Sequence, residues 1–162
     1  MPSDFVPVAE RFVAFVDSSS SLGREELIRQ LERQLLDLYA AGLDLRPPEP
    51  VDESEPPASM TDDERAALHL RLAKEFGEFD IYWFTFDPYD HGSTPVAGSL
   101  ADDVADVYRD LSDGLAVLSS GGDLRTVLWE WRFGFDHHWG RHVAHALYAV
   151  YALTVNQLGG HS

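Results

Sequence analysis

Histidines and aspartates recur at helical spacing in two separate segments, and they are the residues best suited to chemistry in this sequence. Asp103, Asp106 and Asp110 follow i, i+3 and i+7 spacing in one segment. A later segment carries four of the seven histidines, namely His137, His138, His142 and His145. Side chains three or four residues apart share one face of a helix. His138, His142 and His145 therefore project together, and the aspartates project from a helix that can lie beside them.

Imidazoles and carboxylates in such a set are typical ligands of a first-row divalent metal ion. The candidate ligands are His138, His142, Asp103 and Asp106, and water in an open position would make hydrolysis the natural reaction. The two histidines are separated by Trp-Gly-Arg and lack the glutamate of the HExxH motif. The sequence therefore excludes a zinc protease of that class.

A structural network is the alternative interpretation of the same residues. In it, the three aspartates meet Arg132, His138 and His142 inside the protein. Every member must then be paired, because an unpaired buried charge costs several kcal/mol. Metal titration of the purified, tag-free protein separates the two interpretations, since the absence of a site for Zn²⁺, Mn²⁺ or Ni²⁺ would exclude the metal hypothesis.

Two helices must position these side chains. Ser99 is the expected N-cap of the first, with Asp102 and Asp103 in its first turn. Its apolar stripe consists of Leu100, Val104, Val107, Leu111, Leu115 and Leu118. The second helix is predicted to run from residue 123 to about 157, because no proline interrupts it, with Gly134 and Gly140 as points where it could bend. Apolar residues cover most of its circumference, which predicts a long central helix surrounded by others.

Further helices are predicted at residues 6–16, from the serines at 18–21 to Gly42, and from 61 to about 76. The second of these carries a leucine stripe at helical spacing, and Thr61 with Glu64 forms a capping-box pattern at the start of the third. Residues 46–60 combine prolines with acidic residues, so they are predicted to form a mobile acidic loop. This loop is a solvated tether or, alternatively, a segment that docks on a basic surface.

Residues 78–90 differ from the rest, since aromatic and β-branched side chains dominate them. Their β-propensity and Pro88 disfavour a helix. No partner strand is evident in the sequence, so an extended aromatic segment lying across the helical core is expected. A hairpin or pairing with a strand of another molecule is the alternative.

Length and charge limit what this chain can be. Its 162 residues suit one domain, residues 1–162, and the pattern predicts an all-α bundle of about five helices. The formal net charge of −16 disfavours nucleic acid and anionic membranes as partners. The absence of cysteine excludes disulfides and thiolate chemistry. Without a secretory signal or a membrane-spanning apolar run, the sequence predicts a cytoplasmic protein.

Several motifs in the second half of the chain resemble a known family. They are Trp83, Phe86-Asp87-Pro88, Gly98-Ser99-Leu100-Ala101-Asp102-Asp103, Tyr108-Arg109-Asp110-Leu111, Trp129-Glu130-Trp131-Arg132-Phe133 and His138-Trp139-Gly140-Arg141-His142. In this order and spacing they resemble the DUF5063 family over residues 82–147. The resemblance implies an α-helical domain of unknown activity.

The resemblance also selects polar positions for attention. Those that match the family pattern are Asp102, Asp103, Asp106, Tyr108, Arg109, Asp110, Arg132, His138 and His142. His137 and His145 fall outside it, which favours a histidine pair with carboxylates over a site with three histidines.

Two classes of function follow. The first is a non-enzymatic binding or regulatory module that uses an acidic face to engage a protein partner with a basic surface. That face would consist of Asp102, Asp103, Asp106, Asp110 and Asp113. The second is a metal-dependent or acid–base enzyme of hydrolase type. It would use His138 and His142 with the aspartates, and Arg132 or Arg109 would hold an anionic group of the substrate. The module is preferred, because the sequence shows neither an activated nucleophile nor a complete ligand set.

Overall fold

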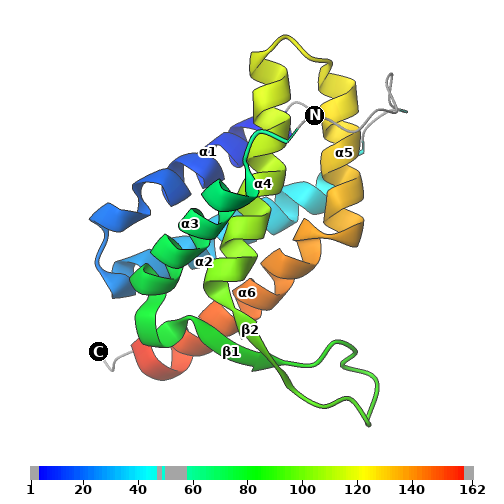
Figure 1. Cartoon of the computed structure of the whole chain (residues 1–162). Coiled ribbons are helices and arrows are strands. Elements are labelled where there is room, and N and C mark those ends of the chain that lie inside the picture. Colours follow the sequence, from blue (N-terminus) through cyan, green and yellow to red (C-terminus); the bar gives the residue numbers. More distant parts are fainter. Residues whose placement is uncertain (1–3, 47–48, 50–57, 159–162) are drawn as a thin grey trace.

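Six α-helices share one hydrophobic core in the computed structural model, which describes residues 4–46, 49 and 58–158. A two-stranded antiparallel sheet joins them at one end of the bundle (Figure 1). The mostly helical architecture confirms the all-α prediction in outline, and the sheet is an addition to it. Residues 47–48 and 50–57, most of the predicted acidic loop, lie outside the described residues. None of the described helices has an apolar run long enough to cross a bilayer.

The N-terminal half forms three helices: α1 (Phe5–Ser18), α2 (Arg24–Asp44) and α3 (Asp62–Phe76). Thr61 and Glu64 form the predicted capping box at the start of α3. Helix α2 begins after Gly23 rather than at the serines, which form a short 3₁₀ turn, and it continues past Gly42. A Cβ on Gly42 would lie 2.5 Å from the ring of Phe135, so this glycine permits close helix packing and is not a helix stop.

Helix α3 is joined to the end of α1 by hydrogen bonds to Glu75. The hydroxyls of Ser19 and Ser20 donate to its two carboxylate oxygens at 2.6 and 2.5 Å, and Arg71 donates at 2.6 Å. Burial would raise the pKa of Glu75, but these hydrogen bonds outweigh it and lower the pKa. The carboxylate is therefore stabilised in its ionised form by the fold.

Helix α4 (Leu100–Ser119) begins as predicted. The Ser99 hydroxyl accepts a hydrogen bond from the Asp102 amide at 3.1 Å and caps the helix. The first four leucines and valines of the predicted stripe are buried, whereas Leu115 and Leu118 are half-buried. Helix α4 packs against α1, α3, α5 and α6, so it is α4 that takes the central place in the bundle.

The single long helix predicted for residues 123–157 is wrong. The chain forms α5 (Leu124–His137) and α6 (Trp139–Leu153), because His138 leaves the helical conformation with φ −143° and ψ −85°. The buried Trp139 ring packs back against α5, where its indole N–H donates to the carbonyl of Trp131 at 2.9 Å. A Cβ on Gly134 would lie 2.7 Å from that ring. Tertiary packing of one tryptophan therefore accounts for the break.

The break changes what the two halves contact. Helix α5 runs beside α4, whereas α6 crosses to pack against α2 and the other end of α4 (Figure 1). Helix α6 is not surrounded, since Tyr148 and Tyr151 on its outer side are 67% and 56% exposed.

The aromatic segment is one strand of a hairpin and not an isolated extended segment. Strand β1 (Ile81–Phe84) pairs with β2 (Val96–Ser99), and Tyr82 lies opposite Gly98. The Asp80 carboxylate accepts hydrogen bonds from the Ser99 hydroxyl at 2.9 Å and the Ala101 amide at 2.8 Å, which joins the hairpin to α4. The connecting loop extends beyond the helices (Figure 1). Strand β2 could not be predicted from the sequence, because Val-Ala-Gly-Ser has little β-propensity of its own.

Candidate functional site

The predicted histidine pair and aspartate row come together where α4 meets the junction of α5 and α6. His138 lies at that junction, and His142 lies on the first turn of α6. Their rings are 5.0 Å apart between centroids and inclined by 75°. Asp103, Asp106 and Asp110 reach them from α4. The two helices thus supply the two halves of the cluster, as the spacing predicted.

Each histidine is held through its Nδ1 atom by a different aspartate. His138 Nδ1 lies 2.6 Å from Asp110 Oδ2, and His142 Nδ1 lies 2.7 Å from Asp103 Oδ1. An ionised carboxylate only accepts hydrogen bonds, so each Nδ1 carries the proton. The Nε2 atom of each ring then carries the lone pair that a cation would use. Carboxylates hold metal-binding histidines in the same way.

Asp106 lies between Asp103 and Asp110 on α4 and completes the cluster. Its Oδ1 accepts two hydrogen bonds from Arg65 of α3, at 2.9 Å from Nε and 2.6 Å from Nη2. Arg109 lies 3.5 Å from the same oxygen. The other oxygen, Oδ2, faces His142 Nε2 at 3.5 Å. The arginines therefore fix the carboxylate with one oxygen directed at the histidines.

One donor atom from each of Asp106, His138 and His142 lies within 4.8 Å of the other two. Ligands about 2.0–2.1 Å from a tetrahedral ion are separated by roughly 3.3 Å, close to the spacing of Asp106 Oδ2 and His142 Nε2. Of the four predicted metal ligands, Asp106, His138 and His142 form this group. Asp103, the fourth, contacts Nδ1 of His142.

Asp103 is almost fully buried, and Tyr82 of the hairpin covers it. The Tyr82 hydroxyl donates to Asp103 Oδ2 at 2.5 Å. Gly98 makes this contact feasible, since a Cβ there would lie 2.6 Å from Tyr82 Cζ. Burial raises the pKa of Asp103 even though His142 and Tyr82 both stabilise its ionised form. Burial, together with the nearby Asp103 charge, also raises the pKa of Tyr82.

The charges of the cluster leave an excess of negative charge. Asp102, Asp103, Asp106 and Asp110 face two guanidinium groups, those of Arg65 and Arg109, which leaves a formal −2 when both histidines are neutral. The hydrogen bond with Asp110 raises the pKa of His138, against the opposing effect of burial. Protons or a cation can therefore compensate the excess.

Two of the predicted cluster residues lie elsewhere. Arg132 forms an ion pair with Asp136 at 2.8 Å and donates to the carbonyl of Gly42 at 3.0 Å. Tyr108 donates to Asp17 of α1 at 2.7 Å. The break at His138 explains why Arg132 lies outside the cluster, because Arg132 belongs to α5, which is oriented differently from α6. Asp102 and Arg109 lie at the edge of the cluster, where they contact Arg65 and Asp106 respectively.

The expected acidic face on α4 is not an exposed surface. Asp103 and Asp106 are only 5% and 8% exposed. Asp110 is paired with His138, and Asp113 accepts hydrogen bonds from the Ser59 amide and hydroxyl at 2.7 Å. The carboxylates of this row are thus engaged in hydrogen bonds and ion pairs within the chain, although the Asp102 side chain is 46% exposed.

Sequence reasoning missed two contributors to the site, Arg65 and Tyr82. Arg65 comes from α3, whose sequence carries no sign of the site. Tyr82 could not be distinguished in the sequence from the other aromatic residues of the hairpin segment. His145, which lies outside the family pattern, packs its ring on Phe84 at 4.3 Å between centroids, and burial lowers its pKa.

The comparisons with known proteins agree with this fold. The family model for a domain of unknown function, DUF5063, matches residues 2–156, well beyond the region of the recognised motifs. The crystal structure of protein BF1032 from Bacteroides fragilis is similar, with a TM-score of 0.79 and 23% identity over 92% of this chain and 89% of that one. At this identity the likeness shows the fold alone. No curated protein sequence matches the chain. The chain belongs to the DUF5063 family.

Proposed function

We propose that the protein binds a first-row divalent metal ion through Asp106, His138 and His142. The observation that carries this proposal is the arrangement of the two histidines. Both rings donate from Nδ1 to a buried or half-buried carboxylate and keep Nε2 for the ion, and a third donor from Asp106 lies close by.

The charge and ligand types support a metal of this class. Imidazole nitrogen with one carboxylate suits Zn²⁺, Mn²⁺ or Ni²⁺ better than Ca²⁺ or Mg²⁺, which prefer oxygen ligands alone. The formal −2 of the cluster matches the charge of the ion. Three protein ligands leave room for water, which is the arrangement that supports metal-assisted hydrolysis.

Titration calorimetry of chelator-treated protein with Zn²⁺, Mn²⁺ and Ni²⁺ tests the proposal. One site per chain is expected for at least one of these ions. Replacement of His142 by glutamine removes one of three ligands and is expected to abolish that site. His137→Gln is the matched control, because this neighbour of His138 is exposed and packs on Phe133 at 4.5 Å. Absence of binding, or equal loss in both variants, would refute the metal site.

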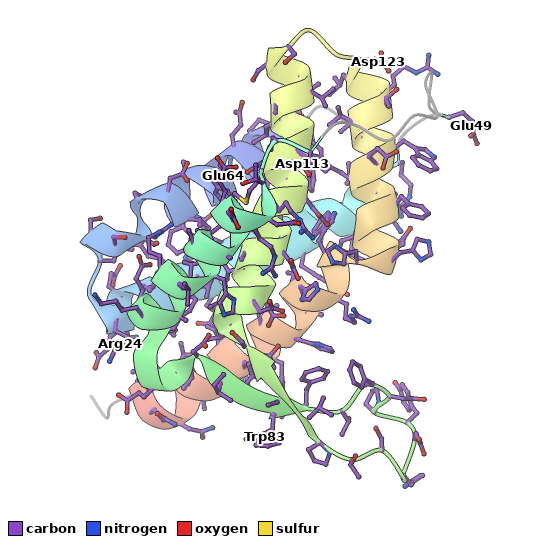
Figure 2. All side chains as sticks on the ribbon, viewed as in Figure 1. Arg24, Glu49, Glu64, Trp83, Asp113 and Asp123 are labelled. Atoms are coloured by element: carbon purple, nitrogen blue, oxygen red, sulfur yellow. The ribbon has the colours of Figure 1, made fainter. Side chains whose placement is uncertain are left out.

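A second candidate function, binding of a protein with a basic surface, is favoured by the hairpin. Trp83 and Tyr89 are 66% and 90% exposed. Figure 2 shows the Trp83 side chain on the hairpin, directed away from the helices. No lysine or arginine occurs between Lys74 and Arg109, so the hairpin and its loop are acidic as well as aromatic. Aromatic faces with nearby carboxylates suit arginine and lysine side chains.

A fluorescently labelled arginine-rich peptide tests this second function by anisotropy, with a glutamate-rich peptide of the same length for comparison. Only the basic peptide is expected to bind. The double variant Trp83→Ser/Tyr89→Ser should weaken binding about fivefold, as the loss of two exposed cation–π contacts implies. Tyr151→Ser, at a tyrosine of α6 that is 56% exposed and lies outside the hairpin, should not. If the double variant binds the basic peptide as tightly as the control variant does, acidic residues outside the hairpin must account for the binding.

A further inference from the structure

A cavity of about 320 Å³ lies between the hairpin and the first turns of α6, and His142 is one of the residues that line it. Residues of β1, β2, α3, α4 and α6 line it. Its size is at the lower end of the range for sites that hold small molecules. A ligand with a single ring fits such a volume.

One wall of the cavity is aromatic. Phe84 packs edge-on against Phe86 at 5.2 Å between centroids, and the His145 ring packs on Phe84 at 4.3 Å. Phe86 is 68% exposed, although it is a large apolar side chain. A planar apolar group entering the cavity would cover this ring and bury surface that now faces solvent.

Three basic side chains of the cavity, those of Arg141, His69 and His145, have hydrogen-bonding groups without a hydrogen-bond partner in residues 4–46, 49 and 58–158. Arg141 is exposed, and its guanidinium group makes neither a hydrogen bond nor an ion pair within the described part of the chain. His69 Nδ1 is buried without a hydrogen-bond partner, and the nearest carboxylate oxygen, Asp102 Oδ1, is 3.8 Å away. The imidazole ring of His145 also lacks a hydrogen bond among the described residues.

The acidic residues of the cavity are already engaged. Asp102 pairs with Arg65 at 2.8 Å, and Asp103 accepts from Tyr82 and His142. What the cavity offers to a ligand is therefore one guanidinium group and two imidazoles beside an aromatic wall. In a chain of net charge −16, an unpaired arginine among histidines is a local exception to the overall field.

We propose that this cavity binds a small organic anion, a carboxylate or a phosphate ester attached to a planar apolar group. Arg141 binds the anionic group, His69 and His145 supply further hydrogen bonds, and Phe84 with Phe86 packs on the apolar group. The cavity's own side chains provide this binding, so it does not depend on the proposed metal ion. His142 also lines the cavity, which places the anion beside the metal centre.

Binding is tested by NMR or calorimetric titration of chelator-treated protein with four probes. Benzoate and phenyl phosphate carry both a ring and an anionic group, phenol has only the ring, and inorganic phosphate only the charge. At least one of the first two is expected to bind saturably, about tenfold or more tightly than phenol and inorganic phosphate. The preferred member of the pair tells whether the natural ligand is a carboxylate or a phosphate ester.

Variants test the assignment to Arg141. Arg141→Gln is expected to weaken the preferred anion about tenfold or more, because a charge-assisted hydrogen bond is lost. Arg11→Gln, at an exposed arginine of α1 outside the cavity, should bind as the unmodified protein does. Equal affinity for phenol, undiminished binding in Arg141→Gln, or binding only after Zn²⁺ or Mn²⁺ is added would each overturn the proposal. If His142→Gln loses metal binding but still binds the anion, the anion proposal is supported independently of the metal site.

Discussion

Replacing Asp103 with asparagine tests whether the carboxylates that bind the histidine Nδ1 atoms contribute to the proposed metal site. Asp103 accepts two hydrogen bonds, from His142 Nδ1 at 2.7 Å and from the Tyr82 hydroxyl at 2.5 Å. Asparagine has the same shape but only one carbonyl oxygen. When its amide group faces His142, the proton is driven from Nδ1 to Nε2, the atom that must bind the ion.

The expected effect follows from that position. Removing the partner that orients a metal-binding histidine reduces affinity about 10- to 100-fold. This corresponds to about 1.4–2.7 kcal/mol in binding free energy. The effect on the fold should be smaller, because asparagine retains the volume of Asp103 and one of its two hydrogen bonds.

The assay is competition with a chromophoric chelator for Zn²⁺ at pH 7, with circular dichroism to verify folding. Asp102→Asn is the matched control, since its side chain is 46% exposed and pairs with Arg65 and not with the histidine pair. A folded Asp103→Asn protein with unchanged affinity would refute the role given to this carboxylate. If that variant fails to fold, Tyr82→Phe provides the second measurement, because it removes one hydrogen bond to Asp103 without altering the charge.

Three further predictions concern the stability of the fold. Gly98→Ala should lower the unfolding free energy by about 1.5–3 kcal/mol in urea denaturation, because a Cβ at 2.6 Å displaces Tyr82 from its charged acceptor; wild-type stability would show that the tyrosine ring can move without cost. Trp139→Ala removes a fully buried indole at the break between α5 and α6, and a loss of about 3–5 kcal/mol is expected in the same assay. Glu75 has a lowered pKa in the folded protein, so its contribution to stability is present above the ordinary value of 4.5 and is lost as the pH falls through the lower folded value. Melting temperatures measured from pH 6 to pH 3 should therefore fall less for Glu75→Gln than for the unmodified chain, and parallel curves would exclude this linkage.

Local patterns in the sequence predicted the helices whose ends are defined by their own residues. The Thr61 capping box and the Ser99 cap begin α3 and α4 because each cap satisfies amides only three residues away. The leucine stripe of α2 is buried as its spacing predicted. The hairpin was different, since β2 is weak alone and pairs with β1 across a loop of eleven residues.

The sequence by itself determined that histidines on one helix and aspartates on another could share a site, because helical periodicity places residues three and four apart on one face. It could not determine which partners meet. The pairing of His142 with Asp103 and His138 with Asp110, and the removal of Arg132 from the cluster, depend on the break at His138. That break results from Trp139 packing against α5, a contact between elements that the periodicity of a single helix does not report. Tertiary packing therefore decided the arrangement of the histidine and aspartate side chains, the contribution of Arg65 and Tyr82 to the cluster, and the cavity beside them.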